Sequence, residues 1–419
     1  MLRVTLVVAC LCAASHAGVL VLDAAGGGDF TTLQQVVDAA QDGDIVLVRP
    51  GDYEASNAFP GATFGNIGLT IVADGTGPVD FPSLRITGIP AGKTFVLRGV
   101  RLVNDVDFGP VFFRLQVDGS QGVTVVEDCY IGGIDDTFIS LPAQVVRVLS
   151  ASLALEDCDI VGSPGKDFIT DTLPANQGNW GLYALAARVS LADCTLAAGS
   201  GGDELTGVSN GAAAGGTGIF SIGSQLQISG CTITGGAGGH DTGAAQPSGA
   251  AAGGAGLIAD VPSLVRLRDS TVSGGAGGTD ASGVPGPDGV AIDAPAGVIV
   301  QLPGPARTVH IDAPLAEGDS GQLLLGGEPG ELAVLLVSFE GTWFNVPKFG
   351  GPLLVGAPAF APWVLGTLDG SGELQVGFVA PHFGLSPDTG MRVVLQVITS
   401  GGAATVLGDA SAFVEQAGP

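Results

Sequence analysis

The chain has 419 residues, of which 41 are acidic and 15 are basic, so its formal net charge is −26 at pH 7. A field of this sign repels nucleic acid and anionic membrane surfaces, which excludes both as expected partners. Hydrophobic residues make up 46% of the chain, enough to bury a core despite the charge, and the length favours two domains over one.

A basic residue and a short apolar run open the chain. Arg3 precedes a mostly apolar stretch over residues 4–14. Ser15 and Ala17 are then the small residues expected at a cleavage site. We therefore expect residues 1–17 to be a secretory signal peptide, and the protein to be secreted to the extracellular space or the cell surface. No later apolar stretch approaches the roughly 18 residues that span a bilayer, so the sequence predicts no membrane span.

The segment after this leader predicts a strand, a short helix and a second strand. Residues 18–22 are typical of a strand, and Thr31 with Gln34 has the spacing of a helix capping box. The apolar stripe of this helix comprises Leu33, Val36, Val37 and Ala40. We expect Gly43 to end the helix, and a strand and turn to follow at residues 45–53.

An eight-residue pattern recurs through the middle of the chain. It reads apolar, any, apolar, any, turn residue, Cys or Ser, any, apolar, with Asp or Gly as the turn residue. Copies begin at Thr124, Leu153, Val189, Leu226 and Val265, and an earlier copy without cysteine begins at Phe95. The cysteine-equivalent position recurs after 29, 29, 36, 37 and 39 residues. A repeat of this length with strand-type alternation inside it predicts a stacked solenoid.

Two early segments carry a resemblance to a known family. Residues 28–34 (Gly-Asp-Phe-Thr-Thr-Leu-Gln) and 42–53 (Asp-Gly-Asp-Ile-Val-Leu-Val-Arg-Pro-Gly-Asp-Tyr) resemble the opening segment of pectin-lyase-like right-handed parallel β-helices. In that family an amphipathic helix closes the end of the solenoid, which would otherwise expose its interior and unpaired strand edges. The resemblance implies an all-β fold, a right-handed parallel β-helix over residues 18–312 with an N-terminal capping helix.

The C-terminal part of the chain has a different pattern. It lacks cysteine and the long Gly-rich insertions, and it carries strand-like runs at residues 331–339, 372–379 and 391–398. Such runs predict a small antiparallel β-sandwich over residues 313–419. This segment is similar to the sandwich modules that follow many exported bacterial β-helices.

Four cysteines occupy the same position of consecutive repeats: Cys129, Cys158, Cys194 and Cys231. We expect them to point inward as a ladder of small apolar side chains, because free cysteine is among the most buried residue types. Export also permits disulfides between neighbouring coils, either Cys129–Cys158 or Cys194–Cys231. A metal site is disfavoured because an inward column lacks tetrahedral geometry and histidine partners.

Insertions rich in Gly, Ala, Ser and Asp follow the cysteine strands at one phase of the repeat, so we expect loops on one face of the solenoid. Acidic residues recur in these insertions at Asp203, Asp241 and Asp280. Stacked acidic loops would gather carboxylates, which suits a hard cation, and a Ca²⁺ site at these three residues is one hypothesis. Solvated loop acids without a cation are the alternative.

Two aspartate segments resemble the catalytic segments of pectin methylesterases. They contain Asp136 and Asp167, and in that family one such aspartate is an acid/base and the other a nucleophile. The match is incomplete, because Asp135 stands where the family carries Gln and no arginine follows to stabilise transition-state charge. A lyase would need a basic proton abstractor, and two candidates, Arg98 and Arg101, are expected to be solvated residues of an outer face.

Trp180 and Tyr183, on a segment expected to project as a loop, are candidates for stacking on a sugar ring. The sequence thus predicts a scaffold without a complete catalytic set. We expect a non-catalytic binding, adhesion or structural module whose partner is a polysaccharide or another cell-surface component. The rival hypothesis, carried by fold analogy, is a carbohydrate-active enzyme: a polysaccharide lyase, an esterase or a glycoside hydrolase.

Overall fold

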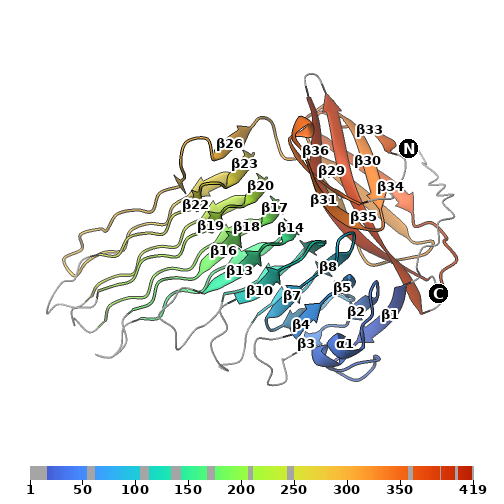
Figure 1. Cartoon of the computed structure of the whole chain (residues 1–419), viewed down its shortest axis with the longest axis horizontal. Coiled ribbons are helices and arrows are strands. Elements are labelled where there is room, and N and C mark those ends of the chain that lie inside the picture. Colours follow the sequence, from blue (N-terminus) through green and yellow to red (C-terminus); the bar gives the residue numbers. More distant parts are fainter. Residues whose placement is uncertain are drawn as a thin grey trace.

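The computed structural model describes residues 17–53, 62–103, 113–133, 143–167, 175–205, 211–242, 250–356, 362–386, 388–401 and 404–417. Regular structure in these ranges is almost entirely β-strand, together with helix α1 (Leu33–Ala39) and the short 3-10 helix η1 (Pro347–Phe349). Successive coils stack side by side into a solenoid, and the C-terminal strands form a group against one flank of it (Figure 1).

Three parallel sheets form the walls of the solenoid, and each full coil contributes one strand to each sheet. Sheet I contains β1 (Ala17–Leu22), β2 (Ile45–Val48), β5 (Leu69–Ala73), β8 (Thr94–Arg98), β11 (Val123–Glu127), β14 (Ser152–Glu156), β17 (Arg188–Ala192), β20 (Gln225–Ser229), β23 (Leu264–Arg268) and β26 (Ile299–Leu302). Sheet II contains β4 (Ala62–Gly65), β7 (Leu84–Thr87), β10 (Phe113–Asp118), β13 (Gln144–Leu149), β16 (Trp180–Leu185), β19 (Ile219–Ile222), β22 (Leu257–Asp260) and β25 (Ile292–Asp293). Sheet III contains β3 (Gly51–Asp52), β6 (Val79–Phe81), β9 (Arg101–Leu102), β12 (Tyr130–Ile131), β15 (Asp159–Val161), β18 (Thr195–Ala197), β21 (Thr232–Thr234) and β24 (Thr271–Ser273). This part of the chain is therefore a parallel β-helix.

The repeated pattern sets the register of the coils. In sheet I, Leu153 pairs with Thr124 on one side and with Val189 on the other, so equivalent pattern positions lie next to one another. The predicted turn position is confirmed, because the turn aspartates have positive φ angles between 45° and 53°: Asp128, Asp157, Asp193 and Asp269. Asp tolerates this left-handed backbone better than most residues, which explains its recurrence there.

Helix α1 lies at the start of the solenoid and packs Leu33 and Val36 into its apolar core. Its capping box is formed by Thr32 and Gln35, one residue later than the sequence pattern indicates. The helix ends at Ala39 rather than near Gly43. The expected element is present, and only its boundaries differ.

The four repeat cysteines line the interior as buried, free thiols. Each sulfur donates to the carbonyl oxygen two residues earlier, as in Cys158 to Glu156 at 3.2 Å and Cys194 to Ala192 at 3.1 Å. Burial raises the pKa of the Cys158 thiol well above its usual value, which disfavours the reactive thiolate. The column therefore fills the core as an apolar ladder.

This ladder predicts a specific thiol titration. Protein that starts after the predicted signal peptide carries four cysteines, and none is expected to react with a thiol reagent in the native state. In unreduced urea-unfolded protein all four should react. Fewer than four titratable thiols would show that disulfides form in place of the ladder.

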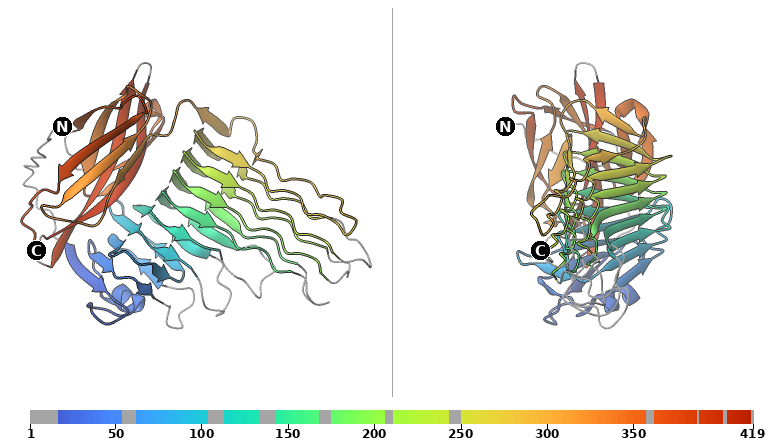
Figure 2. Two further views of the ribbon diagram at one scale, coloured as in Figure 1. Left: turned by 180° about the vertical axis from the view of Figure 1, so that it is seen from behind. Right: turned by 90° about the vertical axis from the view of Figure 1, so that its left-hand side faces the viewer.

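The Gly-rich insertions form ordered, extended segments rather than independent loops, and we call these segments legs. Outgoing legs follow sheet III strands at residues 162–167, 198–205, 235–242 and 274–280, and return legs lead back to sheet II at residues 175–179, 211–217, 250–256 and 286–291. The legs run alongside one another away from the three sheets (Figure 2). They form one stacked array, which we call the Gly array.

Hydrogen bonds in the Gly array recur every three residues. The amides of Gly235, Gly238 and Asp241 donate to the next outgoing leg at 2.9, 2.8 and 2.8 Å. Between outgoing and return legs, Gly236 donates to Gly216 at 2.8 Å and Gly239 donates to Ala213 at 2.9 Å. A period of three is that of polyproline II, whereas a β-strand would pair with a period of two. The Gly array is thus a two-layer stack of polyproline II-like segments.

The C-terminal strands are mainly antiparallel and share a second apolar core. One sheet, which we call sheet IV, contains β27 (Thr308–Ile311), β29 (Ser320–Gly326) and β34 (Glu373–Val379). The others are β28 (Leu315–Ala316), β30 (Leu332–Ser338), β33 (Trp363–Thr367), β35 (Thr389–Gly401) and β36 (Ala404–Gln416), with the pair β31 (Gly341–Val346) and β32 (Gly351–Val355). Strand β35 pairs antiparallel with β1, so sheet I continues into the C-terminal unit. The strand at residues 308–311, which the sequence pattern assigns to the β-helix, pairs with β29.

The C-terminal unit covers the outer side of sheet I in its early coils. Val96, Val123 and Val125 point away from the interior and form an apolar cluster with residues such as Leu354 and Ala412. Strands apolar on both faces are typical of sheets buried on both sides. None of the helices in the described residues is long and apolar enough to cross a membrane.

Candidate functional site on the outer face of sheet II

Only one of the two predicted catalytic aspartates lies within the described residues. Asp136 lies outside the described residues. Asp167 lies on the first outgoing leg, and its Oδ1 accepts a hydrogen bond of 2.9 Å from the amide of Asp203. The same contact repeats one leg on, where Asp203 Oδ1 accepts from the amide of His240 at 2.6 Å. These two side chains therefore link one leg of the Gly array to the next.

The three predicted calcium ligands do not form one cluster. Asp280 caps its own turn and accepts from the amides of Ser282 and Val284 at 2.9 and 2.8 Å. Asp241 is buried, and Asp203 is stapled to the neighbouring leg. Within the described ranges, the ligand atoms of these three carboxylates do not all lie within 4.8 Å of one another. Their arrangement does not fit a Ca²⁺ cage, which needs converging oxygens.

Trp180 and Tyr183 lie on strand β16, not on a projecting loop, and both face outward with Phe220 of β19. The ring of Phe220 stacks with Trp180 at 5.0 Å and with Tyr183 at 6.0 Å between centroids, with interplanar angles of 17° and 16°. All three side chains are half-buried. We call Trp180, Tyr183 and Phe220 the aromatic patch.

Sequence reasoning missed Phe220, although the repeat spacing identifies it. Tyr183 pairs with Phe220 across neighbouring coils, 37 residues later, and Cys194 is followed by Cys231 at the same distance. Applying the repeat length to every position, rather than to the cysteines alone, places the third ring beside the other two.

Polar groups adjoin the aromatic patch on the preceding coil. Gln144 pairs with Trp180, and Arg147 pairs with Tyr183. Two nitrogens here are buried and make no hydrogen bond within the described residues, namely Trp180 Nε1 and Arg147 Nε. Unpaired buried donors are uncommon in folded proteins and cost free energy. The patch therefore combines half-buried aromatic rings with the polar side chains of Gln144 and Arg147, while the two unpaired nitrogens lie beneath its surface.

Farther along the same face, Asp118 gathers several donors. It accepts from Arg85 Nη2 at 2.6 Å, from the Thr87 hydroxyl at 2.6 Å and from Gln116 Nε2 at 2.5 Å. Burial alone would raise the pKa of Asp118, but the hydrogen bonds from Thr87 and Arg85 outweigh it and hold the pKa below its usual value. Asp118 is thus ionised at neutral pH and cannot serve there as a proton donor.

Arg98 is not solvated, contrary to the expectation from its position at a strand end. It is 4% exposed and donates to the carbonyl oxygens of Ile311 and Ala412 at 2.5 and 2.7 Å, which joins the β-helix to the C-terminal unit. Glu127, fully buried beside it, accepts from the Ser411 hydroxyl at 2.5 Å and the Ala412 amide at 2.9 Å. This ion pair fastens sheet I to the edge of β36.

Carboxyl groups of raised pKa cluster under the same interface. Burial raises the pKa of Glu127 and Asp193 to about 7, and that of Glu156 and Asp409 well above the usual range. Perturbed acids often mark active sites, but structural clusters perturb pKa values in the same way. Glu156 and Asp409 are only 4% and 7% exposed, so a polymeric substrate has no access to them.

Glu127, Asp128 and His310 bring possible ligand atoms within 4.8 Å of one another. Arg98 already contacts both carboxylates, at 3.3 Å to Glu127 and 2.9 Å to Asp128. The guanidinium supplies the positive charge that a cation would bring, and a second cation beside it would be repelled. This group is therefore part of the interface rather than a metal site.

Comparison with known proteins adds little to this picture. No protein family matches the chain, and no curated protein is detectably similar to it in sequence. Full-length tailspike protein 2 of Escherichia coli O157:H7 bacteriophage CAB120 is similar with a TM-score of 0.22 and 9% identity, over 93% of this chain and 67% of that one. The enzymatically active domain of bacteriophage CBA120 tailspike protein 2 gives a TM-score of 0.17 and 10% identity, over 91% and 73%. Scores this low support no conclusion about fold or function.

The structure itself defines the class of protein. The chain is a parallel β-helix extended on one side by the Gly array, flanked by a C-terminal antiparallel unit, and carrying an aromatic patch on the outer face of sheet II.

Proposed function

We propose that this protein is a secreted, non-catalytic β-helix protein that binds an uncharged polysaccharide at the cell surface through the aromatic patch. The proposal includes a pectin-lyase-like β-helix over residues 18–312 and a C-terminal β-sandwich module over residues 313–419. An anionic polysaccharide is disfavoured as the partner, because a net charge of −26 repels it.

The aromatic patch with its neighbouring polar side chains carries this proposal. Binding sites for small organic groups combine apolar and aromatic surface with a few placed polar atoms. The rings of Trp180, Tyr183 and Phe220 offer the apolar part, and the half-buried side chains of Gln144 and Arg147 beside them offer the polar part. The parallel strands repeat along one axis, which suits an elongated polymer.

The positions of the acidic groups favour binding over hydrolysis. A glycosidase needs two carboxyl groups on either side of an accessible bond, one of them protonated at working pH. Three described acids of strongly raised pKa are buried away from this face: Glu156 and Asp409 at the interface between the two units, and Glu415 within the C-terminal unit. On the open face of sheet II, Asp118 is held ionised by Arg85.

A glycan panel tests the proposal. We expect at least one uncharged polysaccharide to bind, and Trp180→Ala and Phe220→Ala each to weaken that binding by about tenfold or more, as loss of about 1.4 kcal/mol implies. Phe344→Ala is the matched control, because Phe344 is 63% exposed on β31, outside the patch. Melting temperatures should show that all three variants fold.

The same panel, assayed for reducing ends and unsaturated products with and without Ca²⁺, should release nothing. Turnover that is abolished by Asp136→Ala or Asp167→Ala would establish the carbohydrate-active enzyme instead. Binding that survives both patch substitutions would remove the aromatic patch as the site.

A further inference from the structure

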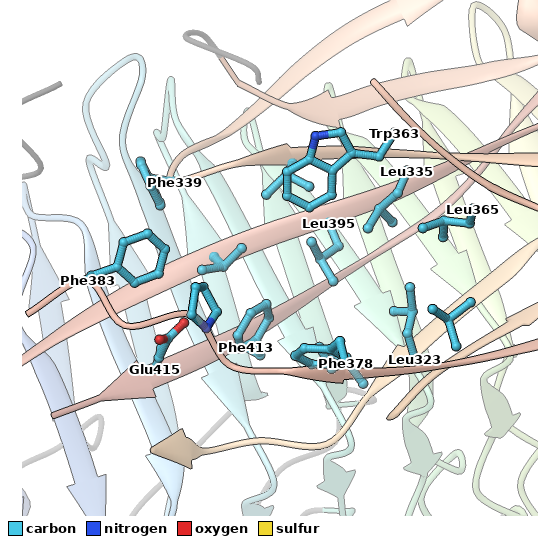
Figure 3. A pocket seen from close by; sticks show the side chains of 15 residues that line it. Leu323, Leu335, Phe339, Trp363, Leu365, Phe378, Phe383, Leu395, Phe413 and Glu415 are labelled. Carbon is cyan, nitrogen blue, oxygen red and sulfur yellow. The ribbon is translucent and has the colours of Figure 1, made fainter. Parts of the chain in front are cut away.

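A second candidate site lies in the C-terminal unit, between sheet IV and the strands that continue sheet I. It is an apolar cavity, partly open to solvent. Its floor includes Leu335, Leu395 and Phe413, and half-buried aromatics such as Trp363 and Phe378 stand around it (Figure 3). Cavities of this kind hold small organic ligands in other proteins.

One acidic side chain lies in this apolar lining. Glu415, on β36, is completely buried, and neither of its carboxylate oxygens has a hydrogen-bond partner within the described residues. It lies at one end of the cavity near Phe383 and Phe413 (Figure 3). Burial, and secondarily the charge of Glu317, raise its pKa to about 8. A buried acid without a partner is costly unless a ligand satisfies it.

The surroundings of Glu415 set the chemistry of such a ligand. No basic residue is among the described residues that line the cavity, and the charge that acts on Glu415 is a second carboxylate, Glu317, which accepts from the Phe383 amide at 2.6 Å. Two acids and the neighbouring aromatic rings attract a cation and repel an anion. The rest of the lining offers only apolar contact.

We propose that the cavity binds a small apolar amine, with its alkyl or aryl body among the aromatic and aliphatic side chains and its ammonium group paired with Glu415. This site is separate from the aromatic patch and does not depend on the proposed polysaccharide binding. A neutral amphiphile would fill the apolar part without the ion pair. A fatty acid would place a third carboxylate beside Glu317 and Glu415.

Calorimetric titration of the full chain with octylamine, octanol and octanoate tests this inference. Octylamine is expected to bind at least tenfold more tightly than the other two. Because Glu415 is mostly protonated at pH 7 and must ionise to pair with an ammonium, octylamine binding should release about one proton, visible as a dependence on buffer ionisation enthalpy. Octanol binding should release none.

Glu415→Gln should reduce octylamine affinity at least tenfold and leave octanol affinity unchanged, which also shows that the cavity remains intact. Glu373→Gln, on an exposed glutamate of β34, is the matched control and should change neither. Equal binding of octylamine and octanol without proton release would overturn the proposal. It would also be overturned if none of the three probes binds, or if octylamine affinity survives Glu415→Gln.

Discussion

Gly236→Ala is expected to disorder the Gly array. The added methyl group would meet the carbonyl oxygen of Gly199 far inside van der Waals contact, and the neighbouring leg cannot retreat because its own amides are bonded to further legs. We expect a local loss of about 3 kcal/mol, at the upper end of the usual cost of overpacking. Amide hydrogen exchange should accelerate at Gly216, Gly238 and Gly254, while exchange in the cysteine strands stays slow.

Ala237→Ser is the control for this substitution. Ala237 is exposed, whereas Gly235, Gly236, Gly238 and Gly239 are buried, so a hydroxyl group on Ala237 points into solvent. Its exchange rates should match those of the parent protein. Unchanged exchange in Gly236→Ala would contradict the close packing of the legs.

The parts of the fold that follow standard periods could be predicted from the sequence. Strand alternation and the recurring cysteine placed the coils, the turn aspartates and the inward column at Cys129, Cys158, Cys194 and Cys231. The Gly array could not be found by the same test, because the period of two for strands and 3.6 for helices leaves Gly-Gly-Ala-Gly-Gly-His unassigned. Its period of three becomes visible only when two legs are paired, as Gly236 is with Gly216.

The interface between the two units had a sequence signal of a different kind. Residues 45–48 and 69–73 are apolar at nearly every position, which indicates strands buried on both faces rather than one. In later coils the outward positions of sheet I become polar, as at Ser190, Gln227 and Arg266. The C-terminal unit covers the apolar coils, so its position could be partly predicted from the sequence. The burial of Arg98 was not, because its partners Ile311 and Ala412 are more than two hundred residues away.

Stability is expected to rise on acidification from pH 8 to pH 5, opposite to the usual trend. Burial raises the folded-state pKa of Glu127 and Asp193 to about 7, and that of Glu156 and Asp409 well above the usual range. Between the unfolded pKa near 4 and these values, the folded state binds more protons than the unfolded state. The stability that protonation gives is therefore present at low pH and is lost as pH rises through the folded pKa.

One unit of pKa shift corresponds to about 1.4 kcal/mol, so the free energy of unfolding should be a few kcal/mol larger at pH 5 than at pH 8, measured by urea titration. The protonation of His310 acts in the same direction, because the carboxylate of Asp157, 3.6 Å from His310 Nδ1, raises the His310 pKa. Carboxylates with lowered pKa, such as Asp118, lose their contribution only below about pH 4, outside this window.

The Glu156→Gln variant distinguishes the effect of the buried interface acids on stability from the effect of general surface charge. Glu156 is buried next to Glu127 in the ladder of sheet I, and its Oε2 has no partner among the described residues, so a neutral amide of the same shape removes like-charge repulsion. The variant should be more stable than the parent at pH 8 and equally stable at pH 5. Its free energy of unfolding should therefore change less with pH between these values. Glu373→Gln, an exposed substitution, should leave the slope unchanged. If parent stability instead increases toward pH 8, the acids beneath the C-terminal unit are not buried together, and the two units do not dock through Arg98 and Glu127.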